Sequence, residues 1–566
     1  MELNQTALFQ QTLERMNNNY NQDLCLMSMP FSSPGYHTTL KGGTVHGTRE
    51  ALHYALMLLA AGEERYTARA CRVIEAVTAL QDQNPGSGTY GIWPWFYEES
   101  LEQMNPPDWN WADFCGKSLC VILHEYGKRL PGSTRQKAER AVLCACGSIM
   151  RRDADVSYTN VALMDCYVTI VAGQLLGHGE FLEYGRSKLR RVWETAERSG
   201  GFAEYNSPTY TLVVLGDLSA MAAHIEDPVS GNYANRLAEM EWQCIAEHFH
   251  VRTGQWAGPH SRCYHSILEQ GLAVKVQKGV PGLQLSPEEE ILSEVCGSRW
   301  HCPERFLPLF IKPRESFDIR RFVKDGSTYL TTEYSWIHPD YTLGSFAVSD
   351  FWNQRRNLIS YYGNRSEPAY LHFRVLHDGA DFTAAEINGV QNRGTVLAGI
   401  HFADDSGDEH LVFNKIKDQT ICAEDIRLRF EFGGFQGETP RWERNTIVVK
   451  DQGMRYAISV PLAAFGGQAP RFTVERQEDK LYADVVLFSG SRQAVCLREL
   501  KKAVCILALC AGPEAVLPAP VLTEGQGTVT AELPEHGLWI CGPAQCRAEE
   551  VLRGDMRRRL CGEPIA

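Results

Sequence analysis

The sequence predicts two regions: a helical toroid, meaning an incomplete (α/α) barrel, over residues 1–310, and an antiparallel β-sandwich over residues 311–566. Up to about residue 310 the apolar residues recur at helical spacing, whereas beyond about residue 315 they alternate with polar residues. The length of 566 residues supports the division, because a chain of this size exceeds one compact core. The second region is itself compatible with a larger sandwich and a small terminal sheet.

The first region contains apolar-periodic segments of roughly 12 to 20 residues, each ending near glycine or a polar turn. Examples are GTREALHYALMLLAAG, RYTARACRVIEAVTALQ, FCGKSLCVILHEYGKRL, STRQKAERAVLCACGSIM and NVALMDCYVTIVAGQLLG. We expect about ten such helices with short connections and no strands between them. A long array of antiparallel helix pairs closes into a toroid or stacks into a solenoid, and the lack of a fixed repeat favours the toroid.

The second region contains short alternating runs rich in β-branched and aromatic residues, separated by Gly, Asp and Asn turns. They include TLGSFAVSD, AYLHFRVLH, GTVLAGIHF, RNTIVVK, MRYAISVPLAAFGG and KLYADVVLFSG. About a dozen strands of this kind fit an antiparallel sandwich better than a parallel sheet. The stretch from Trp300 to Arg320 contains three prolines and is predicted to be a linker.

The composition narrows the classes of partner. The formal net charge is −13 and no Lys/Arg-rich run is present, so we expect no nucleic-acid partner. An acidic ligand would need a local basic pocket. We expect no signal peptide, because the first residues lack a basic stretch followed by an apolar one, and no membrane-spanning run. The 18 scattered cysteines, with no zinc-like spacing, fit buried thiols in a reducing cytoplasm, where we expect the protein to be.

The first candidate cluster, residues 89–116, holds four tryptophans within 19 residues among carboxylates and amides. Indole rings stack on the apolar faces of sugars, while Asn and Asp side chains bind sugar hydroxyls. The alternative is that these aromatic residues belong to the core. The predicted sugar-binding residues of this cluster are Trp93, Trp95, Trp109, Asn110, Trp111 and Asp113.

Two further clusters follow tight turns. GGFAEYNSPTYT (residues 200–211) places Asn206 and Tyr210 near a helix N-terminus, where Asn206 could also be only a helix cap. QWAGPHSRCYH (residues 255–265) gathers His260, Arg262, Tyr264 and His265 after a Gly-Pro turn. A purely structural role would have to satisfy all four polar side chains of the second cluster within one short loop.

Together these residue types meet the demands of β-elimination from a uronic acid. The C5 proton is weakly acidic, and its removal requires that the neighbouring carboxylate be neutralised by amide or guanidinium donors such as Asn206 and Arg262. A base then takes the proton and an acid protonates the departing glycosidic oxygen. Imidazole and phenol fit these roles, the phenol with a pKa lowered by a nearby cation. No metal or organic cofactor is required.

The motifs TYGIWPW, WNWADFCG, NVALMD, EYNSPTY and GPHSRCYH, in this order, resemble the heparinase II/III-like and alginate-lyase-like polysaccharide lyases. The resemblance implies a toroid-plus-sandwich fold and cleavage of acidic polysaccharide by β-elimination. It implies Asn206 as the neutralising residue, His260 as the base, and either Tyr210 or Tyr264 as the second proton-transfer group. Asn160 and Glu204 would be further substrate contacts.

The sandwich region offers its own candidates. Gln354 and Arg355, in FWNQRRNL, are predicted substrate contacts. The resemblance implies that the sandwich lends a histidine such as His401 to the cleft, and that a structural zinc or calcium ion is sometimes bound there. The weaker metal candidates are His401, Asp405 and His410, in a run that also fits a polar hairpin turn.

Two alternatives stay open at this point. A glycoside hydrolase on the same toroid would use paired carboxylates such as Asp113 and Glu204. A non-catalytic glycan-binding protein would use the tryptophans alone. The lyase prediction is favoured by the His-Arg-Tyr cluster, which a hydrolase does not need. The expected partner is an acidic oligosaccharide or polysaccharide; the particular uronic acid and the oligomeric state do not follow from the sequence.

Overall fold

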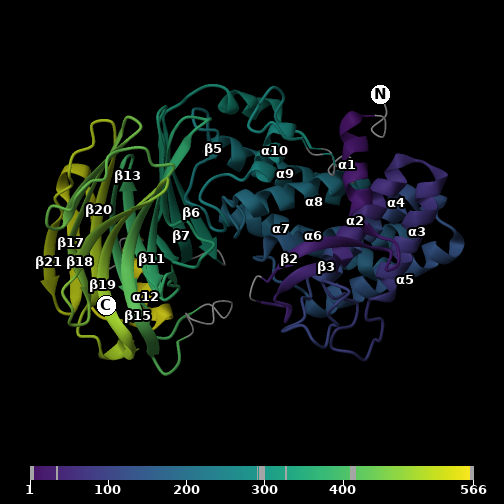
Figure 1. Ribbon diagram of the computed structural model, residues 1–566, viewed down its shortest axis with the longest axis horizontal. Coiled ribbons are helices and arrows are strands. Elements are labelled where there is room, and N and C mark those ends of the chain that lie inside the picture. The colour runs from purple at the N-terminus through teal and green to yellow at the C-terminus, as the bar shows by residue number, and fades with distance from the viewer. Residues whose placement is uncertain are drawn as a thin grey trace.

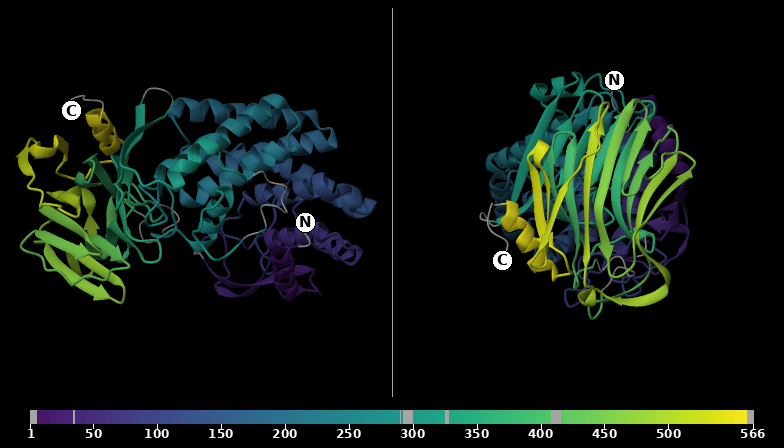
Figure 2. Two further views of the ribbon diagram at one scale, coloured as in Figure 1. Left: turned by 90° about the horizontal axis from the view of Figure 1, so that it is seen from above. Right: turned by 90° about the vertical axis from the view of Figure 1, so that its left-hand side faces the viewer.

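The computed structural model describes residues 6–33, 36–289, 291, 300–324, 328–407 and 416–560. Helices fill one end of the molecule and sheets the other, in the predicted order (Figure 1). Seen from above, the two regions meet along one side of the helical array (Figure 2). The helices are α1 (Ala7–Asn18), α2 (Thr48–Ala61), α3 (Glu64–Ala79), α4 (Trp111–Tyr126), α5 (Gly132–Arg152), α6 (Thr159–Leu176), α7 (Gly179–Ser199), α8 (Pro208–His224), α9 (Pro228–His248), α10 (Gln270–Gly279) and α12 (Glu549–Leu560).

Consecutive helices form hairpins that build an inner and an outer row. The hairpins are α2–α3, α4–α5, α6–α7 and α8–α9, and their first members contact one another in the order α2, α4, α6, α8. The inner helices α6 and α8 are buried almost all round, whereas α7 has one buried stripe. Because each hairpin reverses direction, the inner helices run parallel and their N-termini lie at the same end of the toroid.

Among the described helices, α6 is the one whose length and apolar composition would allow it to cross a membrane. Other parts of the protein bury 83% of this segment, as in the core helix of a toroid. The sequence analysis found no membrane-spanning run, and in this structure α6 is a packed inner helix.

A three-stranded sheet that the sequence analysis missed precedes the toroid. It consists of β1 (Tyr20–Asn21), β2 (Leu26–Ser32) and β3 (Gly42–Gly47). A two-residue hairpin, β4 (Phe249–His250) with β5 (Gln255–Trp256), follows α9 and leads into the loop of residues 257–265. The helical region is therefore interrupted by short strands, contrary to the expectation.

The sandwich consists of two antiparallel sheets that enclose an apolar core. The larger has the order β18-β19-β15-β11-β10-β8-β7-β6, with β12 beside β11, and the other has the order β16-β17-β20-β14-β13-β9. Their strands are β6 (Ser316–Lys324), β7 (Thr328–Ile337), β8 (Thr342–Phe346), β9 (Val348–Asp350), β10 (Leu358–Gly363), β11 (Pro368–His377), β12 (Ala380–Asp381), β13 (Ala385–Asn392), β14 (Thr395–Phe402), β15 (Thr420–Gly433), β16 (Thr446–Asp451), β17 (Met454–Phe465), β18 (Arg471–Gln477), β19 (Lys480–Cys496) and β20 (Ala503–Gly512).

A third sheet covers the outer face of the second one. It is formed by β21 (Val521–Gly525), β22 (Thr528–Leu533) and β23 (Leu538–Pro543). Leu397 of β14 packs outward with Val529 and Ile540, whereas Val396 points into the sandwich core. Strand β14 is therefore buried on both faces, which explains its continuous apolar run.

The predicted linker is folded in part. A 3₁₀ helix spans Glu304–Phe310, and β6 begins at Ser316. Trp300, Phe306 and Phe310 pack into an apolar cluster with α8, α9 and α10. The prolines thus shape a packed connection.

The toroid and the sandwich touch through the loop after β5. His260 and Arg356 form an isolated antiparallel bridge, with backbone hydrogen bonds of 3.2 and 3.0 Å. A Cβ atom on Gly344 would lie 1.9 Å from the carbonyl oxygen of Gly258, so only glycine allows this approach of β8 to the loop. The sandwich therefore fixes the position of the loop that carries Arg262.

Candidate active site

Arg262 joins three parts of the chain. Its guanidinium forms an ion pair with Glu204, Nη2 donates to the hydroxyl of Tyr210 (2.9 Å), and Nε donates to Oε1 of Gln354 (3.0 Å). The guanidinium carbon lies 3.8 Å from the centre of the Tyr210 ring and 5.2 Å from that of Trp352. The side chain is 17% exposed, so this cation is fixed at the edge of solvent by both regions.

Glu204 connects Arg262 to the N-terminus of α6. Its Oε2 accepts hydrogen bonds from the backbone nitrogen (3.0 Å) and from Nδ2 (2.6 Å) of Asn160, in the first turn of that helix. A carboxylate is stabilised by the free N–H groups and the positive end of a helix dipole. Glu204 therefore lies between a helix terminus and a guanidinium.

Tyr210 connects the cation to solvent. Ser207 caps α8 by accepting from the backbone nitrogen of Tyr210 (3.1 Å), and Pro208 occupies the first helical position. The Tyr210 hydroxyl lies 2.7 Å from that of Tyr264, whose side chain is 44% exposed. A chain of polar groups thus runs from Glu204 through Arg262 and Tyr210 to Tyr264.

The environment raises the pKa of Tyr210. Burial is the largest cause; Arg262 opposes it, and Tyr264 and Glu204 raise the pKa further. The expectation that a neighbouring cation gives Tyr210 a lowered phenol pKa is therefore wrong. The cation lowers the pKa, but desolvation and the nearby carboxylate outweigh it.

A group of aromatic and acidic side chains lies near this chain of polar groups. The ring of Trp95 lies 5.1 Å from that of Trp111, and its Nε1 donates to Oδ2 of Asp108 (3.1 Å). Burial raises the pKa of Tyr36; Tyr264 and Asp108 raise it further and Arg262 lowers it, so Tyr36 lies near the same groups. The sequence analysis identified both tryptophans but missed Tyr36 and Asp108.

Tyr158 and Asn110 extend this group. Nδ2 of Asn110 lies 3.4 Å from the Tyr158 hydroxyl, and Tyr158 stands just before α6. Burial raises the pKa of Tyr158, which Arg262 lowers and Glu204 raises. The sequence offers a signal for two of the missed residues. Asp108 and Tyr158 stand directly before WNW and TN, which contain predicted substrate contacts.

Trp93 and Asp113 are not in this site. Trp93 is fully buried and its Nε1 donates to the carbonyl of Val77 (2.9 Å), so it is a core residue. Asp113 is buried beside Asp165. Burial is the largest cause that raises the pKa of Asp113, and the charge of Asp165 raises it further. It therefore cannot pair with Glu204 as a hydrolase would require. Trp109 is 37% exposed and donates to the carbonyl of Gly88 (3.3 Å).

Asn206 and His260 brace the loops behind the site. Nδ2 of Asn206 donates to the carbonyls of Ala257 (3.0 Å) and Pro259 (2.7 Å), and its Oδ1 accepts from Trp256. Both amide hydrogens are thus used, so the prediction that Asn206 neutralises a substrate carboxylate conflicts with its contacts.

His260 has no exposed surface. Its Nδ1 lies 3.0 Å from the carbonyl of Asn206 and its Nε2 lies 3.3 Å from the hydroxyl of Tyr361, and burial lowers its pKa to about 3. Both imidazole nitrogens thus have partners inside the protein, so the prediction of His260 as the base conflicts with its burial and contacts.

The other predicted contacts are spread out. His265 is exposed and pairs with Glu269 (3.0 Å). His401 is buried in β14, with Nδ1 2.9 Å from the carbonyl of Pro543, because the third sheet covers it, so it has no surface for a substrate. Asp405 accepts from the backbone nitrogen of Glu549 at the start of α12, and His410 lies outside the described residues. The predicted metal ligands His401 and Asp405 are thus each engaged by backbone groups.

The described residues bring together one other set of three potential metal ligands, His124, Glu125 and His224. They lie at the C-terminal ends of α4 and α8, and the active-site residues lie at the N-terminal ends. Nε2 of His224 (2.9 Å) and Nδ1 of His124 (3.3 Å) both lie against Oε1 of Glu125, so the three groups contact one another directly.

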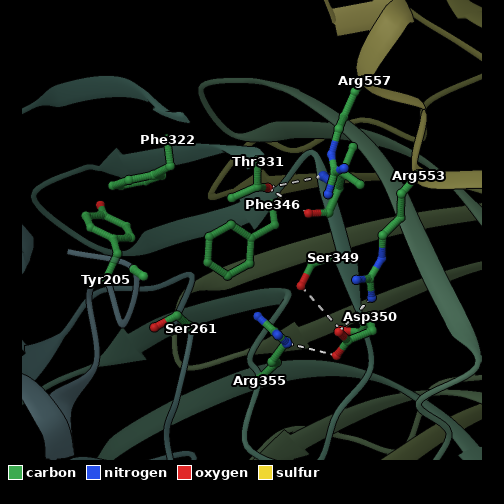
Figure 3. A pocket seen from close by; sticks show the side chains of 12 residues that line it. Tyr205, Ser261, Phe322, Thr331, Phe346, Ser349, Asp350, Arg355, Arg553 and Arg557 are labelled. Carbon is green, nitrogen blue, oxygen red and sulfur yellow. Dashed lines mark hydrogen bonds and ion pairs between the residues drawn. The ribbon is translucent and has the colours of Figure 1, made fainter. Parts of the chain in front are cut away.

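Arg355 lines a separate pocket of about 160 Å³ behind the active-site loops (Figure 3). Tyr205 and Ser261 form one side, and Arg553 and Arg557 of α12 reach in from the other. Arg355 and Arg553 both pair with Asp350, at 2.8 and 2.9 Å. The C-terminal helix therefore supports the loop that carries Gln354.

Comparison with known proteins establishes the fold. Residues 6–280 match the model of a family described as a domain of unknown function, DUF8769. No curated protein sequence matches the chain. The chondroitin AC lyase of Streptomyces coelicolor A3, solved with chondroitin sulphate, is similar at a TM-score of 0.50 and 12% identity, over 96% of this chain and 86% of that one.

Two further solved structures are similar at lower scores. Heparinase III has a TM-score of 0.44 and 10% identity, over 88% of this chain and 82% of that one. A mutant of the heparan sulfate lyase HepC from Pedobacter heparinus has a TM-score of 0.41 and 9% identity, over 94% and 89%. The chain thus has the fold of the polysaccharide lyases, an (α/α) toroid followed by an antiparallel β-sandwich.

Proposed function

We propose that this protein is a lyase that cleaves a uronate-containing oligosaccharide or polysaccharide by β-elimination. The observation that carries the proposal is the chain of contacts in which Arg262 joins the Asn160–Glu204 pair to Tyr210 and Tyr264. In it a guanidinium lies next to a phenol hydroxyl, which supports a carboxylate-binding cation beside a proton-transfer group. The lyase fold supports the same reaction class.

In the proposed mechanism the uronate carboxylate binds at Arg262, with Asn160 as the amide donor. Neutralising this charge makes the C5 proton removable, because the carbanion that forms places a second negative charge on the same group. The Tyr210 oxygen takes the C5 proton, the C4–O bond breaks, and a C4–C5 double bond forms. Tyr210 or Tyr264 returns a proton to the glycosidic oxygen, so no water is consumed.

The charges support an acidic substrate, and the cysteines support a location in the cytoplasm. Arg262 offers the local cation that an acidic glycan needs in a chain of net charge −13. All 16 described cysteines are free, which fits a reducing compartment and supports the proposal of a cytoplasmic enzyme acting on imported oligosaccharides.

The direct test is to incubate the purified protein with alginate, glucuronan, heparan, chondroitin and hyaluronan. β-Elimination leaves a double bond conjugated to the carboxylate, which absorbs ultraviolet light, whereas hydrolysis creates reducing ends without this absorbance. We expect the absorbance to rise with at least one substrate. New reducing ends without absorbance would instead identify a hydrolase.

We predict that kcat/KM rises with pH across the neutral and alkaline range. Tyr210 must lose its proton to act as the base, and its pKa in the free protein lies above the ordinary value of about 10. The fraction of Tyr210 that is deprotonated is then below about one in a thousand at pH 7, and it grows tenfold per pH unit. A pH–rate profile checks this, and a bell centred at pH 6 to 7 would point to an imidazole base.

Asn160 and Asn206 are expected to respond in opposite ways to replacement by alanine. Asn160→Ala removes a donor at the carboxylate site and should lower kcat/KM by about 10²-fold. It also removes one hydrogen bond to the Glu204 carboxylate, which the backbone nitrogen of residue 160 still binds, so the free energy of unfolding should fall by only about 1.5 kcal/mol. Asn206→Ala leaves two carbonyls and the indole of Trp256 without partners, and should lower the free energy of unfolding by about 3 kcal/mol or more.

Steady-state kinetics and urea denaturation of both variants separate these outcomes. An Asn206→Ala protein of normal stability but without activity would instead identify Asn206 as the residue that neutralises the substrate carboxylate.

A further inference from the structure

A second candidate site lies at the end of the toroid opposite the proposed active site. His124 and Glu125 lie in the last turn of α4, and His224 is the last residue of α8. Both helices pack against the inner helix α6, whose Tyr167 contacts the imidazole of His224. None of these residues belongs to the polar chain around Arg262, so the proposed lyase centre does not account for them.

Two imidazoles meet at one carboxylate oxygen. Oε1 of Glu125 lies 2.9 Å from Nε2 of His224 and 3.3 Å from Nδ1 of His124. One potential ligand atom from each of the three side chains lies within 4.8 Å of the other two. In a tetrahedral zinc site with bonds of about 2.0–2.2 Å, neighbouring ligand atoms are about 3.3 Å apart. The two contacts to Glu125 therefore already have about the spacing of metal ligands.

His224 is held in the orientation that a metal ligand needs. Its side chain is 1% exposed, and its Nδ1 lies 2.7 Å from the hydroxyl of Tyr167. Its backbone carbonyl accepts a hydrogen bond from Nε2 of Gln174 (3.1 Å). The second nitrogen of a metal-binding imidazole almost always has such a polar partner, which fixes the ring and its tautomer. When Nδ1 carries the proton and donates to Tyr167, the lone pair of Nε2 is left for an ion.

The site is open to solvent on one side. The side chain of Glu125 is 36% exposed and that of His124 is 29% exposed, so an ion can enter without separating the helices. The two imidazole rings stack at 4.2 Å and are 28° from parallel, so His124 has to turn its ring toward a shared ion. Among the described residues, Glu125 alone forms a hydrogen bond with the His124 side chain, and this rotation therefore disturbs little else.

The local charges favour a cation. The C-termini of α4 and α8 meet here, and the free carbonyl groups of a helix C-terminus carry partial negative charge. Glu125 adds a full negative charge, and in the described part of the chain it pairs with histidines alone. Of the basic residues that follow α4, Lys128 is exposed and Arg129 donates to the carbonyl of Leu59 (2.8 Å).

The types of ligand select the class of metal. Imidazole nitrogens bind Zn²⁺ and other first-row transition-metal ions, and a carboxylate oxygen completes many zinc sites. Ca²⁺ and Mg²⁺ instead prefer sites built from oxygen alone. A site with two imidazoles and one carboxylate is therefore expected to discriminate between these two classes.

We propose that His124, Glu125 and His224 bind one divalent transition-metal ion of the Zn²⁺ class. Nε2 of His224, a ring nitrogen of His124 and a carboxylate oxygen of Glu125 are the three protein ligands, and water from the open side takes the fourth position. The ion links the last turn of α4 to that of α8. The site is separate from the proposed lyase centre, and its occupancy does not depend on that activity.

The test is isothermal titration calorimetry of the intact protein with zinc chloride, after treatment with EDTA and dialysis. We expect saturable binding of one Zn²⁺ per chain at this site, and binding of Ca²⁺ and Mg²⁺ weaker by about a hundredfold or more. Co²⁺ gives a second readout, because its visible spectrum reports nitrogen and oxygen ligands, whereas binding to a cysteine thiolate would add a strong near-ultraviolet band.

Two variants remove one ligand each at partly exposed positions. His124→Ala and Glu125→Gln should each weaken Zn²⁺ binding by about tenfold or more. His301→Ala removes an exposed histidine outside the site and should leave the binding unchanged. Circular dichroism without metal checks that all three variants are folded. Zn²⁺ should raise the midpoint of thermal unfolding of the wild-type protein more than that of His124→Ala.

Three results would overturn the proposal: no saturable binding of Zn²⁺, Zn²⁺ binding that both His124→Ala and Glu125→Gln leave intact, or Ca²⁺ bound as tightly as Zn²⁺. Because the readout is binding, a protein that lacks lyase activity can still pass this test.

Discussion

Replacing Tyr210 by phenylalanine is expected to lower kcat of the proposed β-elimination by about 10³-fold or more, within the range of a lost acid–base group. The change removes only the hydroxyl, which accepts from Arg262 (2.9 Å) and contacts Tyr264 (2.7 Å). The phenyl ring stays under the guanidinium at the same position, so the fold and the placement of Arg262 should persist. The measurement is the rate of ultraviolet absorbance increase with the substrate that the wild-type protein cleaves.

Tyr264→Phe is the matched control. Tyr264 is half-exposed and contacts the cation through Tyr210, so its loss should cost clearly less activity than that of Tyr210. If Tyr264→Phe abolishes the reaction while Tyr210→Phe leaves it nearly unchanged, then Tyr264 is the base and Tyr210 is not.

The fold was predictable because burial leaves a clear period in the sequence. The outer helix α7 buries residues at helical spacing, whereas the strand β16 buries every second residue, and each signal follows from the one face that neighbouring elements cover. The strands β1 and β4 have two residues each, too short to show any alternation. α12 was missed because a helix that packs by only a few apolar residues, such as Leu552 and Met556, leaves a weak pattern.

The sequence predicted which loops form the candidate site, but it did not predict the role of each residue in them. Arg262, Tyr210 and Tyr264 stand in the clusters that the sequence singled out, because chemistry concentrates after tight turns. The roles of Asn206 and His260 depend on which way each side chain points. Asn206 bonds backbone carbonyls of residues about 50 positions later, and His260 meets Tyr361 about 100 positions later. No local pattern encodes such contacts.

Replacing Arg262 by glutamine is expected to abolish activity and to destabilise the protein. Arg262 is the proposed neutraliser of the substrate carboxylate, and loss of one such donor costs about 10²- to 10³-fold in rate. The change also leaves the nearly buried carboxylate of Glu204 without its cation, and breaking a buried pair from one side costs about 3–5 kcal/mol. A drop in activity alone would therefore not separate catalysis from folding.

The double variant Glu204→Gln with Arg262→Gln separates them. It removes both charges, so the penalty of an unpaired buried carboxylate disappears and most of the lost stability should return. Asn160 can still donate to the amide oxygen at position 204, which keeps the N-terminus of α6 capped. Activity should stay as low as in Arg262→Gln, because no cation is left to neutralise the substrate.

Urea denaturation and kcat/KM of the two single variants and the double variant complete the cycle. Glu204→Gln alone keeps the cation and frees it from its internal partner, so its kcat/KM should far exceed that of either variant that lacks Arg262. If activity instead returned together with stability in the double variant, Arg262 would be a positioning residue and the neutralising group would have to be sought elsewhere. Recovery of stability without recovery of activity is what a catalytic cation held by a structural carboxylate requires.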